Sequence, residues 1–322
     1  MDDKLRVGIV CAGTMAKRMA KTLSKMEKIE VTAIASLEIT KAARIAKKYQ
    51  IPNVFDSYEV MAGSSDVDLV YIAAVNNAHR DLIRMFLNNG KHVFCEKPLT
   101  MTGAEARELY ELAGKLHLFL GEAMWLTFLP QIVGMKKAIE EEKIGIITKV
   151  SMSIGFDMRK KERLLSKEMG GGALRDIGIY QIALCNMIFG TEYDELCTVQ
   201  VQTETGVDKS SITVLLLKNG VLLTIESDLS QKLDNRIIFY GTDGRIVLED
   251  FLIGNEVTYF TKEGTETVRD ESGRDVYSYE WENVIRTLSA ERNSNHENET
   301  ISSLELIDDI MKKWRVKNYG GK

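Results

Sequence analysis

The feature that most constrains the fold is a regular alternation of apolar, strand-like runs and amphipathic, helix-like runs through the first 120 residues. The alternating periods predict strands over 5–10, 31–36, 68–74, 92–96 and 117–121, and helices over 16–25, 41–49, 78–89 and 103–116. The last of these helices begins with Thr102 as its cap and has Glu105 three residues later. Such alternation is typical of a parallel sheet with right-handed crossovers. We therefore predict a doubly wound α/β domain over residues 1–121.

The pattern changes after Glu122. Two longer helices are expected over 129–142 and 172–189, together with β-rich runs over 146–156, 196–205, 209–217, 221–230 and 235–241. Asn219 and Gly220 form a hairpin-type turn between two of these runs. The pattern predicts a second, α+β domain over residues 122–322 that contains an open, mostly antiparallel sheet. Its last helix, over 302–317, is free to pack back on the first domain.

Composition excludes several classes of protein. The chain has 322 residues, a formal net charge of −5 and no basic block, which argues against nucleic acid as a partner. No run approaches the twenty apolar residues that a membrane span needs, and the start of the chain has no apolar secretory segment. The four cysteines have neither metal-ligand nor CxxC spacing. We therefore expect a cytoplasmic protein without a metal site.

The turn after the first strand has an incomplete dinucleotide-binding pattern. Gly8, Gly13 and Ala16 match it in part, but Cys11 stands where the first glycine of GxGxxG would fall. Gly13 lets the backbone approach a pyrophosphate, and the following helix offers free N–H groups at its positive end. We expect cofactor contacts from Ala12, Gly13, Thr14 and Met15. Taken alone, this pattern also suits an ordinary strand–helix connection.

The end of the second strand should contact the adenosine ribose. An acidic residue is usual there in NAD-binding domains, but this chain has Ser36, followed by Leu37, Glu38 and Lys41. Ser36 leaves room for a 2′-phosphate, whereas Leu37 offers no guanidinium to hold one. Glu38 is either a ribose ligand or an exposed acid at a helix start. The choice between NAD and NADP therefore stays open.

A second strand end carries the sequence Cys95-Glu96-Lys97-Pro98-Leu99-Thr100. Ligands of open α/β sheets bind at the carboxyl ends of the strands. The proline has a fixed φ and restricts the backbone next to the lysine. Lys97 is therefore expected to lie over a cofactor, and this position makes a nicotinamide-dependent dehydrogenase the favoured interpretation.

Together with this segment, three further stretches make the chain resemble the Gfo/Idh/MocA oxidoreductase family, especially its dihydrodiol and D-xylose dehydrogenase branch. They are Ala73-Ala74-Val75-Asn76-Asn77-Ala78-His79, Glu122-Ala123-Met124-Trp125 and Gly170–Tyr180. The resemblance covers nearly the whole chain and implies a Rossmann domain with NAD or NADP as cofactor. Thr127 and Leu37 stand where that branch usually has arginines, which weakens inference about substrate and about NADP.

The resemblance also implies roles for individual residues. It places Lys97 beside the nicotinamide, and Asp176 and Tyr180 opposite Lys97 on the second domain. Residues expected to line the cofactor cleft are Ala74, Asn76, His79, Glu96 and Trp125.

The residues themselves support acid–base chemistry. Asp176 and Tyr180 are spaced i, i+4 and would share one helix face, and the glycines at 170–172 would allow a ligand to approach that helix. Tyrosine has an ordinary pKa near 10, and a nearby ammonium such as that of Lys97 would lower it. Tyr180 could then accept a hydroxyl proton as hydride leaves the carbinol carbon.

The expected reaction is hydride transfer between NAD(P) and a secondary alcohol or carbonyl of a sugar, polyol or cyclic diol. Two alternatives stay open: a non-catalytic NAD(P)-binding sensor, and a redox-neutral lyase or glycosidase that retains NAD. Apolar residues on both faces of the second domain's sheet predict a homodimer or homotetramer.

Overall fold

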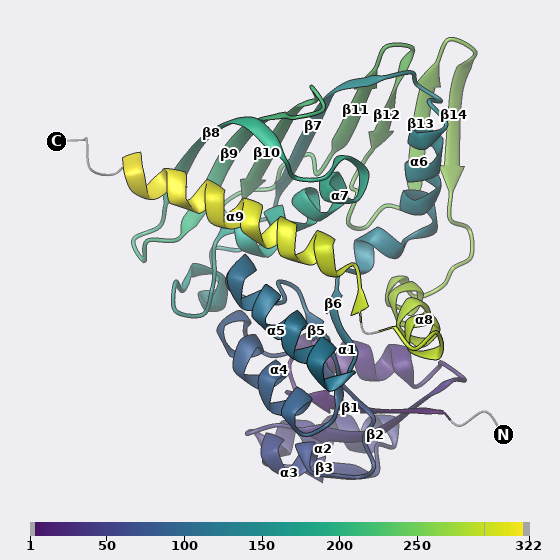
Figure 1. The fold of residues 1–322 in the computed structure, drawn as a ribbon, viewed down its shortest axis with the longest axis vertical. Coiled ribbons are helices and arrows are strands. Elements are labelled where there is room, and N and C mark those ends of the chain that lie inside the picture. The colour runs from purple at the N-terminus through teal and green to yellow at the C-terminus, as the bar shows by residue number, and fades with distance from the viewer. Residues whose placement is uncertain (1–3, 293, 318–322) are drawn as a thin grey trace. The chain divides into compact units, whose positions relative to one another are not determined.

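The computed structural model describes residues 4–292 and 294–317, which form two compact units (Figure 1). The first unit comprises the chain up to Trp125 together with Arg274–Ile301, and the second comprises Leu126–Gly273 with the segment from Ser302 onward. The sequence-based boundary after residue 121 thus differs from the observed one, and the segment 274–301 joins the first unit. A change in periodicity along the chain marks a boundary but cannot reveal a segment that returns to an earlier unit.

The first unit contains a seven-stranded sheet in the order β15-β6-β5-β4-β1-β2-β3, with every neighbouring pair parallel. From β1 the chain proceeds outward through β2 and β3 on one side and through β4, β5 and β6 on the other. This is the doubly wound order. The strands are β1 (Leu5–Val10), β2 (Ile29–Ala35), β3 (Asn53–Phe55), β4 (Leu69–Ile72), β5 (His92–Glu96), β6 (Leu120–Ala123) and β15 (Ser294–Asn295).

Helices connect and cover these strands. They are α1 (Thr14–Leu23), α2 (Ile39–Tyr49), α3 (Tyr58–Ala62), the 3₁₀ turn η1 (Asn76–Ala78), α4 (His79–Asn88), α5 (Gly103–Leu116) and α8 (Val276–Ser289). Helix α8 is held to the unit by the fully buried Trp281. Its ring packs edge-on against Phe94 with centroids 5.2 Å apart, and its indole N–H points to the sulfur of Met19 at 2.9 Å.

The second unit is built on an eight-stranded sheet in the order β14-β13-β12-β11-β7-β10-β9-β8. Only β7 and β10 pair in parallel, so the sheet is mixed and mostly antiparallel. Its strands are β7 (Ile147–Gly155), β8 (Tyr193–Gln202), β9 (Asp208–Leu217), β10 (Leu222–Asp228), β11 (Ile237–Gly241), β12 (Gly244–Leu248), β13 (Glu256–Thr261) and β14 (Gly264–Arg269).

Helices of the second unit lie across one face of this sheet (Figure 1). They are α6 (Pro130–Glu140), α7 (Ile179–Phe189) and α9 (Glu297–Lys317), with the short turns η2 (Trp125–Phe128), η3 (Glu162–Leu165) and the π-helical η4 (Leu174–Gly178). On the covered face Phe189 of α7 contacts Phe239, and the indole of Trp314 donates to Thr198 at 2.8 Å. On the other face Val199 and Ile212 are 58% and 44% exposed.

The predicted fold class is confirmed, with local differences. His117 adopts a left-handed φ of 55° as the cap of α5, so the strand expected over 117–121 begins only at Leu120. The helix expected over 172–189 opens with a π-helical turn. Strands β12 to β14 and helix α8 were not predicted. Every side chain of β14 is exposed, so this edge strand lacks the buried alternation on which strand prediction depends.

Candidate active site

The carboxyl ends of β1, β2, β4, β5 and β6 share one edge of the first sheet. That topology brings together most of the expected cofactor residues, which lie at or after the ends of these strands, at 12–15, 36–41, 74–79, 96–97 and 125.

Gly8 in β1 and Gly13 in the turn after it have different surroundings. A Cβ on Gly8 would meet Val67 and Met61 at 3.1–3.2 Å, whereas a Cβ on Gly13 would meet nothing within 4 Å. Gly8 therefore serves packing, and the space at Gly13 faces away from the protein's own atoms. Cys11 adopts a left-handed φ of 75°, which is the kind of backbone conformation that favours glycine.

The start of α1 is suited to an anion. Gly13 caps the helix without a side-chain hydrogen bond, and the first turn contains no acidic residue. Gly13 and Thr14 are exposed, while Ala12 and Met15 are half-buried. Free N–H groups at the positive end of a helix bind phosphate groups. These residues fit the pyrophosphate of a dinucleotide.

The end of β2 carries a polar but uncharged side chain. Ser36 is buried and its hydroxyl oxygen accepts a hydrogen bond from the N–H of Glu38 at 3.1 Å. Leu37 is 76% exposed, and the carboxylate of Glu38 pairs with the Lys41 ammonium at 2.7 Å on the surface. The structure thus shows Glu38 as an exposed acid at the start of α2.

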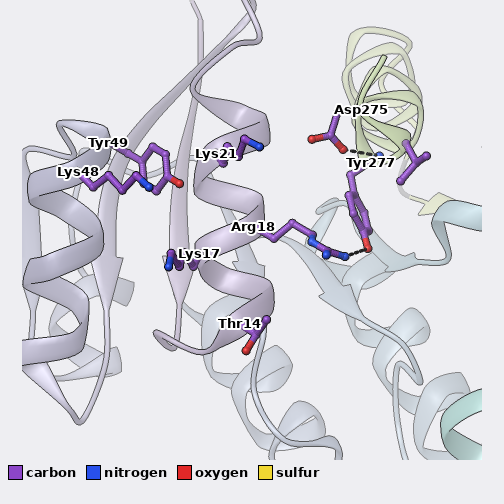
Figure 2. A pocket seen from close by; sticks show the side chains of 9 residues that line it. Thr14, Lys17, Arg18, Lys21, Lys48, Tyr49, Asp275 and Tyr277 are labelled. Atoms are coloured by element: carbon purple, nitrogen blue, oxygen red, sulfur yellow. Dashed lines mark hydrogen bonds between the residues drawn. The ribbon is translucent and has the colours of Figure 1, made fainter. Parts of the chain in front are cut away.

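A hollow of about 630 Å³ lies beside α1 (Figure 2). Its lining residues come from α1, the end of α2 and the start of α8: Thr14, Lys17, Arg18, Lys21, Lys48, Tyr49, Asp275, Val276 and Tyr277. Arg18 donates to the Tyr277 hydroxyl at 2.8 Å, and the Tyr277 ring lies 5.7 Å from that of Trp125. The contribution of α8 to this region was not predicted, because nothing in the sequence links residues 274–289 to the first unit.

The end of β4 is tied to the end of β5 by a histidine. His79 is completely buried, with Nδ1 2.8 Å from the carbonyl oxygen of Pro98 and Nε2 3.2 Å from that of Ala74. Its ring is occupied with the backbone on both sides of the site, so it positions the segments that carry Ala74 and Lys97. Asn76 is also buried, whereas Ala74 and Lys97 are half-buried.

Two buried acids near Glu96 were not predicted as site residues. The Tyr71 hydroxyl donates to the half-buried Glu96. Glu280 of α8 is fully buried, and neither of its carboxyl oxygens has a hydrogen-bond partner among the residues that the structure describes. Burial and the neighbouring charge of Glu96 raise the pKa of Glu280 well above its usual range.

The second buried acid is Glu122, which lies within β6, one residue before its end. Its carboxyl accepts hydrogen bonds from the Leu99 N–H at 2.8 Å and from the Thr300 hydroxyl at 3.1 Å. Burial raises its pKa to about 7, with these hydrogen bonds and Lys97 opposing the shift. The predicted strand ended at residue 121, so the sequence did not indicate that Glu122 lies within a buried strand.

In the second unit, Asp176 and Tyr180 lie on successive segments rather than on one α-helix. Asp176 belongs to the π-helical turn η4, is buried and pairs with Arg163 at 3.0 Å; Tyr180 begins α7 and is half-buried. The change from π to α geometry falls between the two residues, which stay four positions apart in one continuous helical segment.

Two of the glycines before η4, Gly171 and Gly172, are in close contact with other parts of the unit. A Cβ on Gly171 would lie 2.3 Å from the Leu164 carbonyl oxygen. Gly172, with φ 117°, would place one 2.2 Å from Oδ1 of Asp208. Asp208, which was not predicted, accepts a hydrogen bond from the Leu174 N–H at 2.7 Å, and burial raises its pKa to about 7.

The chain matches known proteins over both units. Residues 5–123 match the NAD-binding Rossmann fold of the GFO/IDH/MocA oxidoreductase family, and residues 132–247 match the C-terminal domain of that family. None of the described helices has the length and apolar character needed to cross a membrane.

Among similar sequences, the trans-1,2-dihydrobenzene-1,2-diol dehydrogenase of Xenopus laevis is 32% identical over 87% of this chain and 88% of its own. The human enzyme of the same name is 32% identical over 76% of this chain and 74% of its own.

Two solved structures show the same fold. A 3-ketoreductase from Actinomadura kijaniata, in complex with NADP and TDP-benzene, superposes with a TM-score of 0.88 at 23% identity and covers 96% of this chain and 98% of its own. A levoglucosan dehydrogenase, in complex with NADH and levoglucosan, superposes with a TM-score of 0.86 at 20% identity and covers 98% of each chain. With both of its domains matched, this chain belongs to the Gfo/Idh/MocA family of NAD(P)-binding oxidoreductases.

Proposed function

We propose that this chain catalyses hydride transfer between a nicotinamide cofactor and a secondary alcohol or carbonyl carbon of a small cyclic diol, sugar or polyol. The observation that carries the proposal is the match to trans-1,2-dihydrobenzene-1,2-diol dehydrogenases across most of the chain. The substrate class is broader than that name, because Thr127 stands where the related branch usually has an arginine.

The proposed roles follow the chemistry of the side chains. When bound, the nicotinamide would accept or supply the hydride. The N–H groups at the start of α1, around Gly13 and Thr14, would hold the pyrophosphate, and Ser36 with its neighbours would border the ribose. Lys97 and Tyr180 would form one proton-transfer unit, with the phenolic oxygen taking the hydroxyl proton in the oxidative direction. Asp176, four residues before Tyr180, would assist.

The test is a panel of cyclic diols, sugars and polyols with NAD and with NADP, followed by the absorbance of the reduced nicotinamide. We expect at least one secondary alcohol to be oxidised, with loss of activity when its hydroxyl is removed. A chain that binds reduced cofactor but turns over no alcohol and no carbonyl compound would be a sensor, and would contradict the proposal. Release of a dehydrated or hydrolysed product without net reduction of the cofactor would contradict it as well.

We also propose that the uncovered face of the second sheet mediates self-association. Cross-strand neighbours Val199 and Ile212 are exposed there, and Leu222 on the next strand is 40% exposed. Exposed apolar patches of this kind mark interaction surfaces.

Ile212→Lys places a charge in this patch and should convert a dimer or larger assembly into a monomer in sedimentation velocity at micromolar concentration. Ile253→Lys is the matched control, because Ile253 is 80% exposed on a different segment and should leave the assembly intact. A wild-type monomer, or equal behaviour of the two variants, would contradict this role of the sheet.

A further inference from the structure

Glu122 lies where an acid is least expected in a parallel sheet. It is within β6, one residue from its end, opposite Cys95 of β5 in the strand register, and only 6% of it is exposed. Its strand neighbours Leu120 and Ala123 are buried and apolar. A buried carboxyl is unfavourable unless hydrogen bonds or charges compensate it. Its contacts therefore indicate what it does.

One carboxyl oxygen holds the backbone directly after Lys97. Glu122 accepts from the Leu99 N–H at 2.8 Å, while His79 lies 2.8 Å from the carbonyl oxygen of Pro98. The segment Lys97–Leu99 is thus fixed from two sides, by a strand and by a helix. The other oxygen accepts from Thr300 at 3.1 Å, which anchors the first turns of α9 to the same carboxyl.

The carboxyl of Glu122 also interacts with nearby charged groups. The ammonium of Lys97 favours its ionised form, whereas the carboxylate of Glu96 on β5 disfavours it. Cys95 on β5 and Tyr110 on α5 also interact with it. Because its pKa is about 7, Glu122 changes charge near neutrality.

We propose that Glu122 is a positioning residue for Lys97, fixing the backbone that carries it and adding a negative charge that stabilises its ammonium. The effect of Glu122 on catalysis rests on the proposed function, whereas its effect on the protonation of Lys97 does not. As pH rises through about 7, the growing charge on Glu122 should keep Lys97 protonated. Below that range the neutral acid should leave only the backbone contact.

The test compares wild type with Glu122→Gln and Thr300→Val. Glutamine keeps the acceptor for Leu99 but carries no charge at any pH. Valine keeps the shape of Thr300 and the charge on Glu122 while removing one hydrogen bond to the carboxylate. The readout is the acylation rate of Lys97 from pH 6 to 10, measured by mass spectrometry of the labelled peptide, with folding checked by circular dichroism.

We expect Glu122→Gln to label Lys97 several-fold to tenfold faster than wild type at pH 8, because tenfold corresponds to one unit in the ammonium pKa. In Thr300→Val, the slower labelling of Lys97 should set in at a higher pH than in wild type, because loss of the Thr300 hydrogen bond raises the pKa of Glu122. Equal labelling of wild type and a folded Glu122→Gln would overturn the proposal. If that variant does not fold, an unshifted profile in Thr300→Val would overturn it instead.

Lys97 labelling needs no substrate. An inactive wild type would therefore defeat the proposed function alone, whereas unchanged labelling would defeat the role of Glu122 alone.

Discussion

The two units each contain a buried carboxyl with the same raised pKa, but in different surroundings. Glu122 in the first unit and Asp208 in the second both have a pKa of about 7 because of burial, and both accept a backbone N–H, at 2.8 and 2.7 Å. Glu122 interacts electrostatically with Lys97, whereas Asp208 interacts with Arg175 and the amides at the start of η4. A perturbed pKa alone therefore does not distinguish a group linked to chemistry from one that holds a helix start.

We expect the largest effects on activity at Lys97 and Tyr180, which lie close in sequence to the amides held by Glu122 and Asp208. Lys97→Met and Tyr180→Phe should each lower kcat by roughly 10²–10⁴, the range of general acid–base catalysis, while cofactor affinity survives. Because the two groups are proposed to act as a unit, the double variant should be scarcely slower than either single one. Steady-state kinetics with fluorescence titration of reduced cofactor provides both measurements.

Additive losses would show that the two residues act separately. A fully active Tyr180→Phe would assign proton transfer to another group.

The next effect concerns the helix start that Asp208 holds. Gly172→Ala should destabilise the protein by roughly 2–4 kcal/mol, because φ is 117° and the new Cβ would lie 2.2 Å from Oδ1 of Asp208. Gly13→Ala is the control, since its Cβ would meet no protein atom within 4 Å. Chemical denaturation should show little change for the control, whose effect should be confined to cofactor affinity. Equal stability of both variants would show that the backbone at the start of η4 can shift to accommodate the new Cβ, which would contradict this prediction.

The sequence predicts more of the scaffold than of the groups that tune the site. Strands such as β1 and β5 are short apolar runs, and an amphipathic helix separates each strand from the next. This alternation predicts a parallel sheet. Gly13 and Lys97 could be predicted as cofactor contacts because each follows the carboxyl end of a strand. The roles of Glu122 and Asp208 could not be predicted, because they depend on which backbone amide the fold brings within hydrogen-bond distance of each carboxyl.

Position in the sequence also misleads where tertiary packing decides. His79 was predicted at the start of a helix, which alone does not indicate burial, yet it is completely buried between two backbone carbonyls. Trp281 is remote along the chain from Phe94 and packs on it. Neither contact has a local signal.

A smaller, pH-dependent effect on stability should be common to both acids. A carboxyl whose pKa is raised in the folded state binds more protons folded than unfolded, so the free energy of unfolding falls as pH rises from about 4 to about 7. Glu122→Gln should remove up to roughly 3 kcal/mol of that loss, and Asp208→Asn up to roughly 4 kcal/mol. Relative to wild type, each variant should therefore gain stability between pH 4 and 8 in denaturant titrations.

Some slope should remain in both variants because Glu280 is buried as well. Variants whose stability relative to wild type does not change with pH would contradict the raised pKa values.

The most direct measurement is the pH dependence of kcat for wild type, Glu122→Gln and Asp208→Asn on one substrate. Wild type should show an inflection near pH 7 that is lost in Glu122→Gln and kept in Asp208→Asn, although both variants alter the pH dependence of stability. An inflection that survives in Glu122→Gln, or disappears in Asp208→Asn, would contradict the distinction between the two acids.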